Sequence, residues 1–178
     1  MTPVFIGLGS NLGNGCENLR AAWAGLGRLS GVQLLRLSSP YHTAPVGMDS
    51  PHWFTNAVGL LETVLPPPEL LVALLGIEAA AGRQRTAAES GKYQDRPLDL
   101  DILFYGNLVQ AGPDLVLPHP EIAGRLFVLA PLVELAPEFV HPVLGLSAAQ
   151  LLARLTTLSG GEGVRKIAWP GEPPAGRK

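Results

Sequence analysis

The chain has 178 residues, a length that suits one domain with a sizeable core. Its composition, 47% hydrophobic and 16% charged, excludes a disordered chain, and its net charge of -2 excludes a broad basic surface for nucleic acid. The one cysteine, Cys16, excludes an internal disulfide and a cysteine-based zinc site. The sequence has no signal-peptide pattern and no apolar run of membrane-spanning length, so we expect a cytoplasmic protein with no membrane partner. We also expect no nucleic-acid partner and a monomer.

The expected elements of the first part of the chain follow the order β-α-β-β-α-β, which is typical of a ferredoxin-like α+β sheet. Apolar or alternating runs indicate strands, and apolar residues at helical spacing, such as Leu19, Ala22 and Leu26, indicate helices. We expect strands over 4–8, 32–38, 54–64 and 98–105, helices ending near Gly27 and Gly82, and loops over 40–51 and 83–95, the second of them mobile.

The rest of the chain adds smaller elements to this sheet. A short strand pair is expected before a corner at His119, which lies between two prolines, and helices are expected over 125–135 and 148–155. The Gly- and Pro-rich residues 159–178 are expected to form a loosely ordered tail. The sequence therefore predicts a single domain over 1–158 with added short strands and C-terminal helices.

Asp99 and Asp101 stand two residues apart in an otherwise apolar strand. Because strand side chains alternate, both carboxylates face the same way, about 7 Å apart by backbone rise, while Leu98, Leu100 and Ile102 face the core. Two carboxylates on one face suit one Mg²⁺ or a pair of ions, as phosphoryl-transfer sites use. The alternative is an exposed strand face with solvated acids. We favour the metal site because arginines closely bracket this strand.

Charged residues near the aspartate pair extend this interpretation. Arg83, Arg85 and Arg96 surround the polar loop, and three guanidinium groups beside two carboxylates would complement a polyphosphate and its metal ions. Surface ion pairs are the alternative. Glu78 continues the apolar stripe of the second helix, where an acid needs a partner. An adenosine hydroxyl or a loop arginine could be that partner, and the alternative is that Glu78 is an exposed residue at the helix end.

Several uncharged residues are also candidates for ligand binding. Asn56 lies on a strand, where asparagine is disfavoured unless its amide is used, and that amide can both donate and accept as the edge of a heterocycle requires. Phe54 and Phe127 have flat rings that can sandwich such a heterocycle, or they are plain core residues. His119 is either a phosphate contact or a structural corner residue. The Gly-Ser-Asn run from Gly9 lacks the lysine and glycine spacing of a phosphate loop.

Taken together, these residues resemble the 6-hydroxymethyl-7,8-dihydropterin pyrophosphokinases of folate biosynthesis. The resemblance runs in order from about Phe5 to Pro137, and the Arg-x-x-Asp-x-Asp signature with the downstream Pro-His and Arg-x-Phe pieces is specific. The matching segments are Gly-Ser-Asn-Leu-Gly at 9–13, Ser-Ser-Pro-Tyr-His-Thr-Ala-Pro at 38–45, Phe-Thr-Asn-Ala at 54–57, Ile-Glu at 77–78, Gly-Arg-Gln-Arg at 82–85, Arg-Pro-Leu-Asp-Leu-Asp-Ile-Leu at 96–103, Leu-Pro-His-Pro at 117–120 and Arg-Leu-Phe-Val-Leu at 125–129.

The resemblance implies transfer of a diphosphate group from ATP to the pterin alcohol, with AMP as the other product and two Mg²⁺ ions as cofactors. It implies that Asp99 and Asp101 hold the metals, and that the catalytic group is Arg83, Arg85, Arg96, Asp99 and Asp101. The implied ATP contacts are Glu78, Arg85, Arg96, Ile102, His119 and Arg125. The implied pterin contacts are Thr43, Pro45, Val46, Phe54, Asn56 and Phe127. The sequence leaves open whether Asp99 or metal coordination removes the alcohol proton.

The chain departs from the family pattern in two places. Many relatives have Trp-Gly-Pro, or a close variant, before the signature arginine, whereas Tyr93, Gln94 and Asp95 stand there in this chain. Asp114 occupies a position that often carries an arginine directed at ATP. Each departure places an aspartate near an expected phosphate site. We therefore expect the two departures to affect the affinity for ATP.

Two other functions fit the sequence less well. A nucleotidyltransferase of the Gly-Ser and Asp-x-Asp type needs its metal acids soon after the Gly-Ser pair, whereas Asp99 follows Gly9 much later in the chain. A non-catalytic ferredoxin-like module that binds RNA would need exposed aromatic residues on the sheet and a basic surface. A metal-dependent ATP signal separates the enzyme from such a module.

Overall fold

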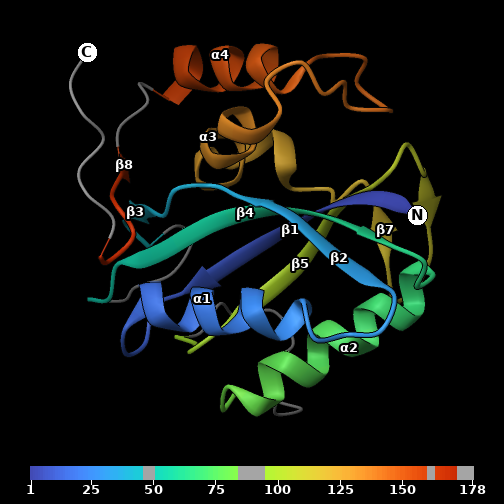
Figure 1. The fold of residues 1–178 in the computed structure, drawn as a ribbon. Coiled ribbons are helices and arrows are strands. Elements are labelled where there is room, and N and C mark those ends of the chain that lie inside the picture. Colours follow the sequence, from blue (N-terminus) through green and yellow to red (C-terminus); the bar gives the residue numbers. More distant parts are fainter. Residues whose placement is uncertain (46–50, 84–94, 160–162, 172–178) are drawn as a thin grey trace.

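The computed structural model describes residues 1–45, 51–83, 95–159 and 163–171, and the structural statements below concern these residues. A six-stranded sheet lies between two helical layers, with α3 and α4 above it and α1 and α2 below it in Figure 1. The elements of the first part are β1 (Thr2–Ser10), α1 (Gly15–Leu26), β2 (Val32–Leu37), β3 (Tyr41–Thr43), β4 (Phe54–Thr63), α2 (Pro67–Ala80) and β5 (Asp99–Tyr105). The later elements are β6 (Gln110–Ala111), β7 (Val116–Leu117), the 3-10 turn η2 (Ile122–Gly124), α3 (Leu126–Leu135), α4 (Ala148–Ser159) and β8 (Val164–Lys166).

The strand order confirms the expected ferredoxin-like α+β fold. The strands run in the order β5-β1-β4, and β2 and β3 pair one after the other along the far side of β4. All of these pairings are antiparallel. Since β2 and β3 share one position beside β4, the order is that of a β-α-β-β-α-β sheet. None of the helices described is both long and apolar enough to cross a membrane.

β3 lies inside the 40–51 segment, which we expected to be a loop. The chain leaves β2 at Ser38, whose N–H donates to the Val58 carbonyl (2.9 Å) and whose hydroxyl accepts from the Val58 N–H (3.0 Å). Three residues are too few to display an alternating pattern, so no local pattern predicted a strand here. β3 is ordered by its two neighbours, because it pairs with β4 on one side and with β8 on the other.

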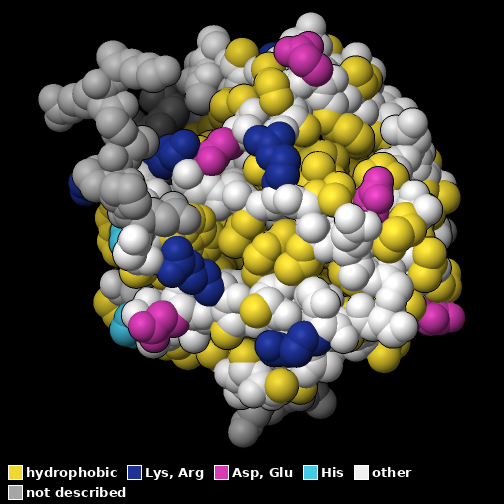
Figure 2. All heavy atoms as spheres, in the orientation of Figure 1, with side chains coloured by type: hydrophobic (Ala, Val, Ile, Leu, Met, Phe, Trp, Pro, Cys, Tyr) yellow, Lys and Arg dark blue, Asp and Glu magenta, His cyan; other side chains and the backbone are white. Residues whose placement is uncertain are grey.

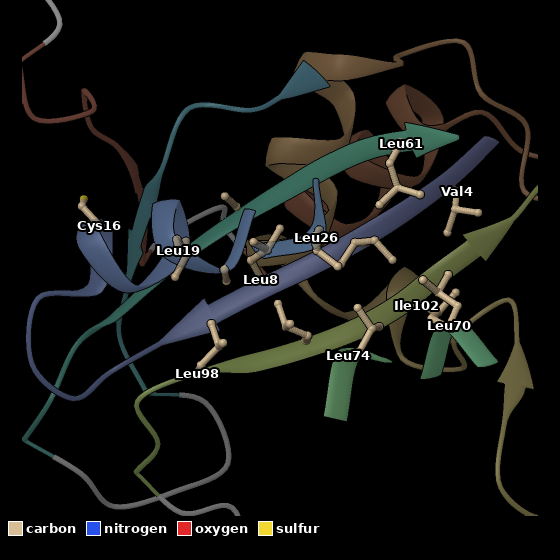
Figure 3. Packing of buried hydrophobic residues seen from close by; sticks show 14 of the residues in the cluster. Val4, Leu8, Cys16, Leu19, Leu26, Leu61, Leu70, Leu74, Leu98 and Ile102 are labelled. Atoms are coloured by element: carbon tan, nitrogen blue, oxygen red, sulfur yellow. The ribbon is translucent and has the colours of Figure 1, made fainter. Parts of the chain in front are cut away.

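The alternation of side chains along the strands divides the interior into two cores. Leu8 and Leu61 belong to the core that packs against α1 and α2, which Figure 3 shows from close by. Phe5 and Leu103 belong to the core under α3 and α4. Polar side chains of β4 and β5 also face the α3 side, at the end of the sheet where β1 ends at Ser10. The fold therefore leaves one region of that sheet face open to a ligand.

Residues 163–171 differ from the expected loosely ordered tail. β8 pairs with β3 over its whole length. The side chain of Trp169 is buried in the core beneath the sheet, and its Nε1–H donates to the Ser38 carbonyl (3.1 Å). Composition failed to predict this order because the contacts are made with strands far away in the sequence. The remainder of that expectation, 160–162 and 172–178, lies outside the described residues.

We expect Trp169→Ala to lower the free energy of unfolding by about 3 kcal/mol, because it empties a large buried site and removes a hydrogen bond. Trp169→Phe keeps most of the ring volume and should cost about 1 kcal/mol. Urea denaturation measures both. Trp53, which is 56% exposed, offers the matched control, and Trp53→Ala should stay within about 0.5 kcal/mol of the parent. If the two alanine substitutions lowered the free energy of unfolding equally, the burial of Trp169 in an ordered C-terminal segment would be refuted.

Candidate active site

Two glycines of β1 form the floor of the open region. Gly9 pairs with Asn56 of β4 on one side and with Asp99 of β5 on the other, and Gly7 pairs with Asp101. A Cβ atom at position 9 would lie 3.1 Å from Asn56 Oδ1 and 3.8 Å from Asp99 Cβ. Glycine within a strand often marks a close approach to a ligand or to another group. Here the missing side chains leave a hollow between an amide and two carboxylates.

This hollow is a cavity of about 260 Å³ on the α3 side of the sheet. Its walls come from β1, β3, β4 and β5 and from the segment that runs through η2 into α3. The expected site residues that line it are Thr43, Phe54, Asn56, Arg96, Asp99, Asp101, His119, Arg125 and Phe127. Residues far apart in the sequence are thus brought to one place, and they include both carboxylates and both candidate stacking rings.

Asp99 is held between two arginines. Its Oδ1 forms an ion pair and hydrogen bond with Arg83 Nη1, and its Oδ2 lies 2.7 Å from Arg96 Nη2. The Arg96 guanidinium also lies over the Phe54 ring, 5.7 Å from its centroid. Both arginine side chains are largely buried. Their charges keep the orientation of the Asp99 carboxylate fixed at the edge of the cavity.

Asp101 faces the same cavity beside Asp99. The pKa of the Asp101 carboxyl is raised from 3.8 to about 6, because burial and the charge of Asp99 raise it more than the charge of Arg96 lowers it. A positive charge placed among these oxygens favours the ionised form. The two carboxylates are therefore candidate ligands for a cation.

Glu78 of α2 is buried beneath the edge of β5. Its Oε1 accepts hydrogen bonds from the Leu100 N–H (2.7 Å) and from Arg83 Nη1 (2.8 Å). A loop arginine is thus a partner of this acid in the structure, and Glu78 does not line the cavity. Because Arg83 contacts both Glu78 and Asp99, the carboxylate of α2 fixes the arginine that orients the site carboxylate.

His119 and Arg125 form the opposite wall. The His119 N–H donates to the Leu103 carbonyl (2.9 Å), and its Nδ1 accepts from the Glu121 N–H (3.2 Å). Burial, together with the charge of Arg125, lowers the pKa of the His119 imidazole. A neutral ring whose Nδ1 accepts carries its proton on Nε2, so it can donate one hydrogen bond. The Arg125 guanidinium lies 5.6 Å from the centroid of the Phe127 ring.

A polar pair closes the cavity at β3 and β4. Asn56 Nδ2 donates to Thr43 Oγ1 over 2.9 Å, and both side chains are buried. This bond fixes the amide plane and leaves Asn56 Oδ1 directed towards Gly9. Phe54 and Phe127 also line the cavity, so aromatic surface and a fixed amide lie together there. The arrangement suits a flat heterocycle.

Comparison with known proteins agrees with this geometry. Residues 5–137 match the family profile described as 7,8-dihydro-6-hydroxymethylpterin-pyrophosphokinase (HPPK). A protein of Synechocystis named 2-amino-4-hydroxy-6-hydroxymethyldihydropteridine pyrophosphokinase is 39% identical over 84% of this chain and 74% of its own length. The protein of the same name from Methylorubrum extorquens is 37% identical over 87% of this chain and 94% of its own length.

This chain belongs to the HPPK family. A solved structure of Plasmodium falciparum HPPK-DHPS with pteroate has the same fold, with a TM-score of 0.71 at 14% identity over 93% of this chain and 48% of that one. The region that matches the HPPK profile runs from within β1 to the end of α3, and it contains every residue that lines the cavity.

Some expected HPPK site residues lie elsewhere or outside the described residues. The side chain of Ile102 is buried in the core on the opposite face of the sheet from the cavity. Pro45 is described but does not line the cavity, and Arg83 does not line it either but contacts the lining residue Asp99. Val46, Arg85, Tyr93 and Gln94 lie outside the described residues.

The two departures from the HPPK pattern differ in their surroundings. Asp95 does not line the cavity, and its Oδ1 accepts from Asn11 Nδ2 over 2.5 Å. Asp114 is exposed in the turn between β6 and β7. Sequence reasoning missed the two floor glycines, although Gly7 and Gly9 alternate within a buried strand, which is a signal for close backbone approach.

Proposed function

We propose that this chain transfers the diphosphate group of ATP to 6-hydroxymethyl-7,8-dihydropterin and releases AMP, as a step of folate biosynthesis. The observation that carries the proposal is the cavity above Gly9, which has a fixed amide on one side and a dicarboxylate on the other. These two ends suit a heterocycle and a metal-bound polyphosphate respectively.

Asp99 and Asp101 are the proposed ligands of two Mg²⁺ ions. Carboxylate oxygens are the donors that Mg²⁺ prefers, and these two project to one face of β5. The raised pKa of Asp101 supports the fit, since a nearby cation would favour its ionised form. Bound there, the ions would neutralise charge on the phosphates during transfer.

The chain's own cations are proposed to bind the ATP phosphates. Arg96 and Arg125 donate N–H groups from opposite walls, and His119 offers its Nε2–H as a neutral donor. In the proposed step the pterin hydroxymethyl group loses its proton and its oxygen bonds to the β-phosphorus, while the bond from that phosphorus to the AMP oxygen breaks. Such transfer depends on positioning and charge stabilisation, which is what these fixed donors provide.

Asn56, Phe54 and Phe127 are proposed to hold the pterin. With one amide N–H bonded to Thr43, Asn56 keeps its oxygen and a second N–H for the edge of the ring. Phe54 and Phe127 offer the faces between which a flat ring can stack. This binding directs the hydroxymethyl group across Gly9 towards the carboxylates.

The proposal is tested by following nucleotide products over time. With ATP, Mg²⁺ and 6-hydroxymethyl-7,8-dihydropterin we expect AMP, and we expect none when the pterin is omitted or when EDTA removes the metal. Asn56→Ala should raise the KM for the pterin and leave the KM for ATP close to that of the parent. Formation of ADP in place of AMP would refute the proposed reaction.

A further inference from the structure

Asp95 is an acid near the site that the proposed function does not use. A carboxylate next to a polyphosphate site would repel the substrate if it faced the cavity. Asp95 instead faces the loop between β1 and α1, where its Oδ1 accepts from Asn11 Nδ2 (2.5 Å). Its Oδ2 lies 3.9 Å from His52 Nε2. The charge is therefore directed towards hydrogen-bond donors and away from the cavity.

Asn11 connects this carboxylate to the backbone of Arg96. The Arg96 N–H donates to Asn11 Oδ1 (2.7 Å), and the Asn11 N–H donates to the Arg96 carbonyl (3.1 Å). The Asn11 side chain is buried, so both ends of its amide are used within the protein, the oxygen by Arg96 and the nitrogen by Asp95. Three hydrogen bonds thus fix residues 95 and 96 against the end of β1.

Asn18 of α1 connects the β1–α1 loop to the segment before β5. Its Nδ2 lies within hydrogen-bond distance of three acceptors, namely Ser10 Oγ (3.0 Å), the Leu12 carbonyl (2.9 Å) and the Pro97 carbonyl (3.1 Å). The β1–α1 loop is therefore held by one asparagine from α1 and itself holds the segment before β5. The Gly-Ser-Asn run from Gly9 lacks the features of a phosphate loop. Its Ser10 and Asn11 side chains instead form hydrogen bonds within this junction.

Arg96 connects these hydrogen bonds to the active site. Its backbone is fixed by Asn11, while its guanidinium contacts Asp99 Oδ2 (2.7 Å) and lies over the Phe54 ring. We propose that Asn11 and Asp95 are positioning residues, whose paired side chains set the place of the Arg96 guanidinium for the reaction. This inference rests on the proposed function, in which Arg96 binds the phosphates.

Exchange of the two side chains tests the pair. Asn11→Asp keeps an oxygen for the Arg96 N–H but brings a second carboxylate against Asp95, so we expect kcat to fall by about 10- to 100-fold, as for a misplaced catalytic group. Adding Asp95→Asn restores one donor and one acceptor, and the double variant should recover to within about threefold of the parent. Asp95→Asn alone should remain close to the parent, because its amide oxygen still accepts from Asn11.

Hydrogen exchange of the Arg96 amide supplies a readout independent of activity. It should be slow in the parent, faster in Asn11→Asp and slow again in the double variant. If Asn11→Asp does not fold, Asp95→Ala tests the inference, because it removes the acceptor for Asn11 Nδ2 and should lower kcat. Glu138→Ala is its control, since it removes an exposed acid between α3 and α4.

Three results overturn the inference: a fully active Asn11→Asp variant, a double variant as slow as Asn11→Asp, or, where Asn11→Asp is unfolded, equal kcat for Asp95→Ala and Glu138→Ala. A parent protein that forms no AMP refutes the proposed function instead. In that case the exchange pattern at Arg96 still reports whether the pair holds the backbone.

Discussion

Asp101→Asn is expected to lower kcat by at least about 100- to 1000-fold, the range associated with loss of one preorganised electrostatic contact to a transition state. The amide has the size of the carboxylate but loses the negative charge that a Mg²⁺ ligand supplies in the proposed reaction. Steady-state AMP formation measures the effect. Glu138→Gln, which neutralises an exposed acid far along the chain from the cavity, is the matched control and should keep the parental rate.

The same substitution should stabilise the metal-free protein at alkaline pH. The Asp101 pKa is raised from 3.8 to about 6 in the folded state, so the folded protein binds this proton more tightly than the unfolded chain does. The stability that the proton contributes is complete below about pH 4 and is lost as the pH rises through about 6. Asparagine does not titrate and avoids this loss.

Urea denaturation in EDTA at two pH values tests this expectation. At pH 8 the Asp101→Asn variant should exceed the parent by up to about 3 kcal/mol, since each pKa unit corresponds to about 1.4 kcal/mol. At pH 3.5 the difference should nearly vanish, because the carboxyl is then largely protonated in both states. Normal turnover in this variant would refute the metal assignment. A stability gain of equal size at both pH values would contradict the electrostatic origin.

Gly9→Val is the second substitution with a large expected effect. A Cβ atom at position 9 would lie 3.1 Å from Asn56 Oδ1, and a branched side chain would extend further into the cavity. We expect kcat/KM for the pterin to fall on the order of 100-fold, because the Asn56 amide must move from the place fixed by Thr43. Pterin binding measured by fluorescence should weaken in parallel.

Gly76→Val is the matched control for this substitution. Gly76 lies within α2, and a Cβ atom there meets no heavy atom within 4 Å. Its free energy of unfolding should change by less than about 0.5 kcal/mol, because glycine and valine are both weak helix formers. Its activity should equal that of the parent. If Gly9→Val also retained parental pterin binding, the cavity floor would not be a ligand site.

The sequence predicted the parts of the fold that depend on local periodicity. Alternation in β5 correctly separated Asp99 and Asp101 from Leu98, Leu100 and Ile102, which are buried on the other face. The order of strands and helices was enough to predict the ferredoxin-like sheet, because each main element is long enough to show its period.

The elements that were missed depend on long-range contacts. β3 and β8 are three residues each, and β3 pairs with both β4 and β8, whereas β8 pairs with β3. The ordered Trp169 depends on an acceptor at Ser38, which no local pattern relates to it. Glycine and proline content is evidence for loops only where no distant partner supplies the missing contacts.

In the site, too, the sequence predicted what depends on local spacing and missed what depends on contacts between distant residues. The aspartate pair follows from spacing, whereas the partners of Glu78 and Asp95 do not. Glu78 bonds to Leu100, and Asp95 bonds to Asn11, across intervals that a single sequence does not relate. Residue types predicted which groups meet phosphate or metal, and only the tertiary fold determined which of them hold the others in place.

The most direct test of the central claim is the identity of the phosphorylated product. Mass spectrometry and ³¹P NMR of a reaction with ATP, Mg²⁺ and 6-hydroxymethyl-7,8-dihydropterin should detect the pterin diphosphate, formed in a one-to-one ratio with AMP. A pterin monophosphate formed together with ADP would contradict the account, as would AMP formed at the same rate without the pterin.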